Sequence, residues 1–185
     1  MIGTKMRDAM NEQIKYEFES SYLYLGMAAY FHGVGFDGMA HWMRAQAIEE
    51  MVHAMKFYDH IYEREGAVEL ASIEPPKKKW NSPLEVFRET LKHEQFVTSR
   101  IHLLAKIAQE ENDYAASVLL HWFINEQVEE ESSAQKAIQK LERVGDFGYG
   151  LQMLDAELGA RPVNWALVQG MVPGAGGQVA GGTQP

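Results

Sequence analysis

Apolar side chains recur every three to four positions along four long segments of the sequence. These segments cover about residues 4–32, 36–65, 82–111 and 113–144, and the spacing predicts one amphipathic helix in each. A fifth segment, about residues 147–158, has room for about three helical turns. The pattern therefore predicts an all-α fold.

The ends of these segments carry helix start and stop signals. The sequence SPLE at 82–85 combines an N-cap serine, a proline at the first helical position and the glutamate of a capping box. Asn112 and Asp113 form a second start signal, before the fourth helix. Gly66 is predicted to cap the end of the second helix.

Loop lengths predict how the helices connect. Only a few residues join the first helix to the second and the third to the fourth, so each pair is expected to be antiparallel. The fifteen residues 67–81 can reach about 50 Å when extended, whereas a helix of about 29 residues is about 43 Å long. We therefore predict a four-helix bundle with a long crossover between helices 2 and 3 and a short fifth helix.

The domain boundary is expected where the composition changes. Residues 1–158 contain all five predicted helices, whereas residues 159–185 are Gly-rich and nearly uncharged. This last stretch is predicted to be a flexible tail with no assigned chemistry.

Polar side chains interrupt the apolar stripe of every long helix near its midpoint. The interrupting residues are Glu17 in the first helix, Glu50 and His53 in the second, Glu94 in the third, and Gln127 and Glu130 in the fourth. The positions in the first two helices map at one constant offset onto those in the last two. The chain is therefore predicted to form two related hairpins around a pseudo-twofold axis.

Divalent metal ions would explain why these groups are buried. Isolated carboxylates in a dry core cost several kcal/mol each or become protonated, whereas carboxylate oxygens and a neutral imidazole are good iron ligands. Glu50 and His53 lie three residues apart and so share one helical face. Alone, His53 would more often be a core histidine, but the full set at one depth is typical of a di-metal carboxylate site.

The composition indicates the class of protein, its binding partners and its location in the cell. Hydrophobic residues make up 46% and charged residues 23% of the chain, as in soluble globular proteins. The absence of cysteine excludes disulfides and thiolate ligands. The net charge of −9 favours attraction of cations and argues against binding to nucleic acid or a membrane. With no signal-peptide pattern and no long apolar run, we expect a cytoplasmic protein.

Specific motifs make the sequence resemble bacterial non-haem ferritins over about residues 1–158. These motifs are Glu17 with Tyr24, EEMVH at 49–53, Glu94, and EQVEE at 126–130. The resemblance implies that Glu17, Glu50 and His53 hold a first iron, and that Glu94 and Glu130, with Glu50, hold a second. It also places Gln127 beside this di-iron centre and Tyr24 as an electron donor. Its implied third iron site comprises Glu49, Glu126 and Glu129.

The same resemblance implies a function. A member of this ferritin-like family is expected to be a ferroxidase that oxidises Fe(II) with dioxygen or hydrogen peroxide. The product is expected to be stored as hydrated ferric oxide, as part of iron homeostasis. The resemblance implies that it is stored inside a homo-oligomeric shell of twenty-four subunits.

Three alternatives stay open from the sequence. Met51 follows Glu50, where haem-binding bacterioferritins carry their haem-ligating methionine, but the second Glu-x-x-His of those proteins is replaced by Gln127-x-x-Glu130. We therefore do not expect haem. A di-iron oxidase that never mineralises iron and a purely structural bundle are the other two. Trp122 is either a redox-active neighbour of the site or a packing residue.

Overall fold

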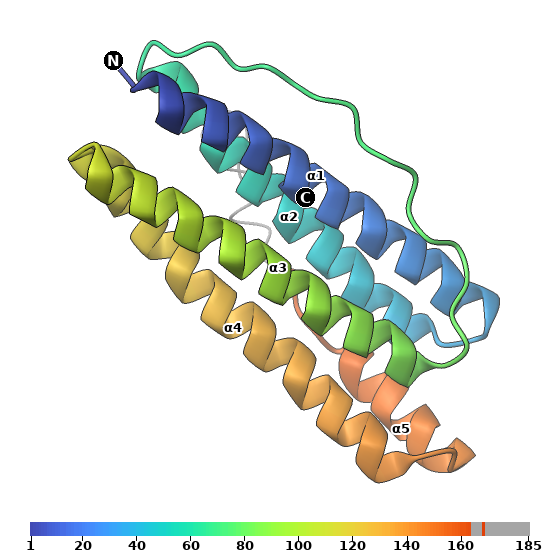
Figure 1. Ribbon diagram of the computed structural model, residues 1–185. Coiled ribbons are helices and arrows are strands. Elements are labelled where there is room, and N and C mark those ends of the chain that lie inside the picture. The colour runs from blue at the N-terminus through green and yellow to red at the C-terminus, as the bar shows by residue number, and fades with distance from the viewer. Residues whose placement is uncertain (164–167, 169–185) are drawn as a thin grey trace, which may run out of the picture.

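The computed structural model describes residues 1–163 and 168, and within them five helices and no strand (Figure 1). Their bounds are α1 Thr4–Gly33, α2 Asp37–Glu63, α3 Pro83–Glu110, α4 Tyr114–Val144 and α5 Gly148–Gly159. In this described part, no helix is long and apolar enough to cross a membrane. The predicted all-α fold is confirmed, with helix ends within two residues of those expected.

The N-caps predicted for α3 and α4 are present. The Ser82 hydroxyl accepts a hydrogen bond from the Glu85 N–H (3.1 Å), and the Asp113 carboxylate accepts one from the Ala116 N–H (3.0 Å). The capping box is displaced, because the Glu85 carboxylate accepts from the backbone N–H of Asn81 (2.8 Å), one residue before the N-cap. Each cap satisfies a donor that the first helical turn leaves free.

The predicted role of Gly66 as the cap of α2 is wrong in its mechanism. The left-handed residue is Glu65, with φ 60°, and the Gly66 N–H donates to the Ile61 carbonyl (2.9 Å). A Cβ on Gly66 would lie 2.7 Å from Ile61 Cγ2 and 2.8 Å from Ile2 Cγ2. Glycine is thus required here by lack of space, and not by its backbone angles.

The long connector runs along the outside of α1, as Figure 1 shows in green. Near its start, the Asn11 side chain accepts from the Glu69 N–H (2.9 Å) and donates to the Ala67 carbonyl (3.1 Å). Near its end, the Trp80 ring packs against Tyr30, with centroids 5.5 Å apart. The connector therefore spans the length of the bundle, and the predicted crossover is confirmed.

The apolar core divides into two clusters with a layer of buried polar residues between them. One cluster includes Phe31, Trp42 and Phe87. The other includes Phe57 and Phe123, whose rings stack at 4.1 Å. Along each of α1 to α4, the interrupting polar residues lie between the segments that feed these two clusters. The packing of both ends of the bundle therefore fixes the middle layer.

Helix α5 is fastened to the start of α2. The Asp155 carboxylate accepts hydrogen bonds from the backbone N–H groups of Gly38 (3.1 Å) and Met39 (2.8 Å), which lie at the positive end of the α2 dipole. Beyond α5, the His41 Nε2 donates to the Arg161 carbonyl (2.9 Å). Apart from residues 159–163 and 168, the predicted Gly-rich tail lies outside the described residues.

Candidate metal centre

Four helices contribute to a cluster of buried polar side chains at mid-depth in the bundle. α1 supplies Glu17 and Tyr24, α2 supplies Glu50 and His53, α3 supplies Glu94, and α4 supplies Gln127 and Glu130. None of the seven is more than 5% exposed. The structure therefore brings together every residue that the sequence assigned to the di-iron centre.

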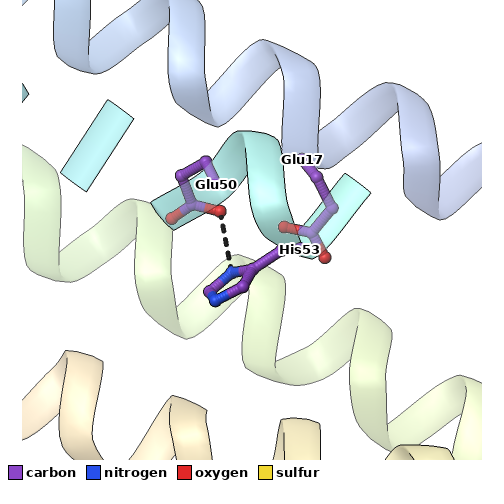
Figure 2. A group of neighbouring side chains, drawn as sticks. All are labelled: Glu17, Glu50 and His53. Atoms are coloured by element: carbon purple, nitrogen blue, oxygen red, sulfur yellow. Dashed lines mark hydrogen bonds and ion pairs between the residues drawn. The ribbon is translucent and has the colours of Figure 1, made fainter. Parts of the chain in front are cut away.

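The first half of the cluster is formed by Glu17, Glu50 and His53 (Figure 2). One potential ligand atom from each lies within 4.8 Å of the others. The Glu50 Oε2 is 3.3 Å from His53 Nδ1, and the Glu17 carboxylate reaches the same space from α1. These three side chains can surround a single cation.

The second half of the cluster is held by neutral donors. The Tyr24 hydroxyl donates to the Glu94 carboxylate, and Gln127 Nε2 donates to Glu94 Oε2 (3.3 Å). Gln46 Nε2 donates to Glu130 Oε2 (2.6 Å). Sequence reasoning did not assign Gln46 to the site, although it lies on the same helical stripe as Glu50 and His53.

Burial raises the pKa of all four carboxyl groups in the cluster. For Glu17 the neighbouring Glu50 adds to the effect of desolvation, and for Glu50 the charges of Glu94 and Glu130 do so; both pKa values lie well above the usual range. Burial raises the pKa of Glu94 to about 7, against the lowering effect of its hydrogen bonds. Burial and Glu94 raise the pKa of Glu130 to about 8. A bound cation would reverse this preference for the neutral forms.

Two atoms in the cluster have no hydrogen-bond partner among the described residues, although they are buried. They are Glu17 Oε2 and His53 Nε2. An unpaired buried acceptor costs free energy, and one nitrogen of a neutral imidazole always carries a lone pair. Carboxylate oxygens with one imidazole form a donor set that suits iron. The residues present therefore fit a metal centre on their chemistry as well as on their positions.

A second potential ligand group lies next to the first. His53, Glu126 and Glu130 place ligand atoms within 4.8 Å of one another. Of the other residues assigned to a third iron site, Glu49 is largely buried and Glu129 is exposed. Burial raises the pKa of Glu49, and the charges of Glu126 and Glu129 add to this, whereas Arg161 lowers it.

Arg161 is a residue near the site that sequence reasoning missed. Its guanidinium forms an ion pair with Glu49 and donates to Gln46 Oε1. The sequence offered one indication of Arg161: it is the last basic residue of the chain and closely follows the predicted fifth helix.

Two further residues noted in the sequence have defined surroundings. The edge of the Trp122 ring contacts His53, with centroids 5.4 Å apart, and the Lys56 ammonium lies 4.3 Å from the Trp122 centroid. Trp122 thus packs directly against a potential ligand. Met51, the residue on which the haem alternative depends, is 42% exposed in the single chain.

Comparison with known proteins gives consistent matches. Residues 7–144 match the ferritin family, described as a ferritin-like domain. A bacterial non-heme ferritin of Bacteroides fragilis (strain 638R) is 43% identical over 161 residues, which are 87% of this chain and all of the relative. One from Staphylococcus aureus (strain USA300) is 38% identical over 87% of this chain and 97% of the relative. The open pore ferritin of Archaeoglobus fulgidus superposes with a TM-score of 0.86 at 45% identity, covering 87% of this chain and 98% of that one.

Proposed function

This chain belongs to the ferritin family of iron-storage proteins, and from that premise we propose that it oxidises Fe(II) at a di-iron centre within each chain. The ferric product is stored as a hydrated oxide mineral inside a hollow shell. The observation that carries this proposal is the convergence of five side chains in one buried layer: Glu17, Glu50, His53, Glu94 and Glu130. Glu17 Oε2 and His53 Nε2 have no hydrogen-bond partner within the described range.

The first Fe(II) is held by Glu17, Glu50 and His53. Their ligand atoms already lie within 4.8 Å of one another, so the site needs little rearrangement to accept the ion. The second Fe(II) is held by Glu94 and Glu130, with Glu50 bridging the two. Anionic oxygen ligands stabilise Fe(III) more than Fe(II), so this ligand set favours loss of an electron from each iron.

The redox step balances with either oxidant. Two Fe(II) ions give two electrons to one dioxygen, which takes up two protons and becomes hydrogen peroxide. With hydrogen peroxide as the oxidant, the same two electrons and two protons give two molecules of water. The protons that Glu94 and Glu130 lose when iron binds are released beside the reacting ions. The two irons supply every electron of this step, so we propose Tyr24, whose hydroxyl donates to Glu94, as the donor of a further electron only where dioxygen is reduced beyond hydrogen peroxide.

The ferric ions then leave the di-iron centre for the mineral. In this proposal Glu49, Glu126 and Glu129 form a third iron site on that route. The net charge of −9 attracts Fe(II) to the protein. Mineral growth requires an enclosed volume, which by family resemblance is a cytoplasmic shell of twenty-four copies with α5 around the fourfold axes.

The exposed apolar side chains around α5 support assembly. Phe147, Tyr149 and Met153 are between 58% and 66% exposed in the single chain. Neighbouring apolar side chains of this size on a surface favour contact with another chain. A shell would cover them.

Aerobic loading with a large excess of Fe(II), followed by gel filtration, tests the proposal. Protein and ferric iron are measured on the same fractions for the wild type, for Glu50→Gln and for a matched control, Glu142→Gln. Glu142 is 47% exposed and pairs with Arg88 at the surface. We expect ferric iron far beyond three ions per chain to co-elute with a shell-sized assembly in the wild type and the control, and rapid oxidation to be lost in Glu50→Gln.

Three results would favour the alternatives. A small oligomer with about two irons per chain would indicate a di-iron oxidase that does not store iron. Equal oxidation rates in Glu50→Gln and the wild type would show that the buried cluster is structural. Haem absorbance in the same fractions would indicate a bacterioferritin-like protein with Met51 as its ligand.

A further inference from the structure

Arg161 places a fixed positive charge at the edge of the proposed third iron site. It follows α5, and its guanidinium pairs with the Glu49 carboxylate. Both side chains are largely buried, with exposures of 21% for Arg161 and 16% for Glu49. This ion pair joins residues 112 positions apart in the sequence, so it depends on the position of the chain beyond α5.

Besides the hydrogen bond to Gln46, two contacts hold Arg161 independently of the acidic residues. Its guanidinium carbon lies 4.7 Å from the centroid of the Trp42 ring, which is a cation–π contact. Its backbone carbonyl accepts a hydrogen bond from His41 Nε2 (2.9 Å). The backbone of Arg161 is therefore held by His41 and its guanidinium by Trp42, so the positive charge stays close to Glu49 when their ion pair is broken.

The acidic groups around Glu49 need a positive charge when no metal ion is bound. The Glu126 and Glu129 carboxylates both act electrostatically on Glu49, and Arg161 is the cation with the largest opposing effect. Beside them, His53 Nε2 is buried with no hydrogen-bond partner in the part of the chain that the structure describes, and His53 forms a potential ligand group with Glu126 and Glu130. Because His53 belongs to both potential ligand groups, a cation in either group would satisfy this nitrogen.

We propose that Arg161 is a tethered counter-cation that occupies Glu49 in the metal-free protein and is displaced when a divalent cation binds among Glu49, Glu126 and Glu129. The inference rests on the proposed function, since it takes the third iron site as real. Two cations on one carboxylate repel each other, so the guanidinium and the metal ion compete for Glu49. Arg161 thereby lowers the affinity of the third site, which keeps iron there in transit.

The role can be tested by binding of Zn²⁺, which is redox-inert and accepts carboxylate and imidazole ligands. The intact assembled protein is titrated by calorimetry and equilibrium dialysis as wild type, Arg161→Gln and Arg161→Lys, each with and without Glu49→Gln. We expect Arg161→Gln to bind the third Zn²⁺ about tenfold more tightly, which corresponds to about 1.4 kcal/mol. Arg161→Lys keeps the charge but loses the forked contact with Gln46 and Glu49, so its third-site affinity is expected to lie between those of the wild type and Arg161→Gln.

A second variant separates this role from an effect on the di-iron centre. Arg161 also donates to Gln46, which in turn donates to Glu130. Gln46→Met breaks that connection but leaves the pair between Arg161 and Glu49 intact. If Gln46→Met tightens the third site as much as Arg161→Gln does, the effect passes through Glu130 and the counter-cation role is refuted.

Other results of the Zn²⁺ titrations would overturn either the role of Arg161 or the proposed function. An unchanged third-site affinity in Arg161→Gln overturns the inference, as does tightening that persists when Glu49→Gln is added. If the first two Zn²⁺ ions bind normally and are lost in Glu50→Gln, such a result leaves the di-iron centre standing and removes only the role of Arg161. If Glu50→Gln does not affect them, the proposed function itself fails.

Discussion

Binding of Fe(II) to the buried cluster should release protons, in a number that falls as the pH rises. The pKa of Glu94 is raised to about 7 and that of Glu130 to about 8. In the metal-free protein at pH 7 these two groups together hold about 1.4 protons, and at pH 8 about 0.6. Burial also raises the pKa values of Glu17 and Glu50, so both groups add to the number of protons released. Metal binding requires the ionised forms, so these protons must leave.

The count is measured by anaerobic calorimetry of Fe(II) binding. Titrations in several buffers of equal pH and different ionisation enthalpy give the number of protons released per chain. Between pH 7 and pH 8 we expect this number to fall by about 0.8. Glu142→Gln, at an exposed site, is the control and should match the wild type.

Two results would refute the reasoning. Release close to zero at pH 7 would mean that the carboxyl groups are already ionised and that burial does not raise their pKa. Release that increases from pH 7 to pH 8 would identify water bound to the metal as the proton source.

Three other predictions follow from the same contacts. The pKa values of Glu94 and Glu130 are raised only in the folded state, so the stability that these two groups contribute is lost as the pH rises from 4.5, their unfolded pKa, through about 7 and about 8. The metal-free protein should therefore be about 2 kcal/mol less stable at pH 8 than at pH 6.5. A higher melting temperature at pH 8 than at pH 6.5, measured in chelator, would contradict this. Tyr24→Phe removes the hydroxyl that donates to Glu94 and should raise the pKa of Glu94 by about one unit. Proton release on Fe(II) binding at pH 8 should then increase by about 0.4 per chain. If calorimetry shows no change in this release, the hydrogen bond does not stabilise the ionised Glu94. Phe57→Ala empties a fully buried position stacked on Phe123 and should lower the free energy of unfolding by about 3–5 kcal/mol in guanidinium denaturation, whereas a loss below about 1 kcal/mol would show that the core closes over the gap.

Helix positions and topology could be predicted because their causes are local. The 3.6-residue period specifies which side chains share a face, and residues such as Met10, Glu17 and Phe31 are all buried as that period requires. The crossover followed from the length of one connector. The role of Gly66 could be predicted only in part. Its position near the end of α2 was correct, but the space that requires glycine is limited by Ile2, which is distant in the sequence, as well as by the nearby Ile61.

The membership of the buried cluster was also contained in the sequence. Burial of Glu17, Glu50, His53, Glu94 and Glu130 follows from their phase on apolar stripes, and phase is a property of each helix by itself. The types of side chain then indicated a metal ion, because carboxylates without a cation are costly to bury.

The partners of these side chains were decided only by the tertiary structure. Gln46 meets Glu130 across 84 positions of sequence, and Arg161 meets Glu49 across 112. Such contacts depend on how far each helix is rotated and shifted against its neighbours, and on where the chain goes after α5. A helical period specifies the direction of a side chain from its own axis. It does not specify which atom of another helix lies at its tip, so the charge balance at Glu49 could be seen only in the folded chain.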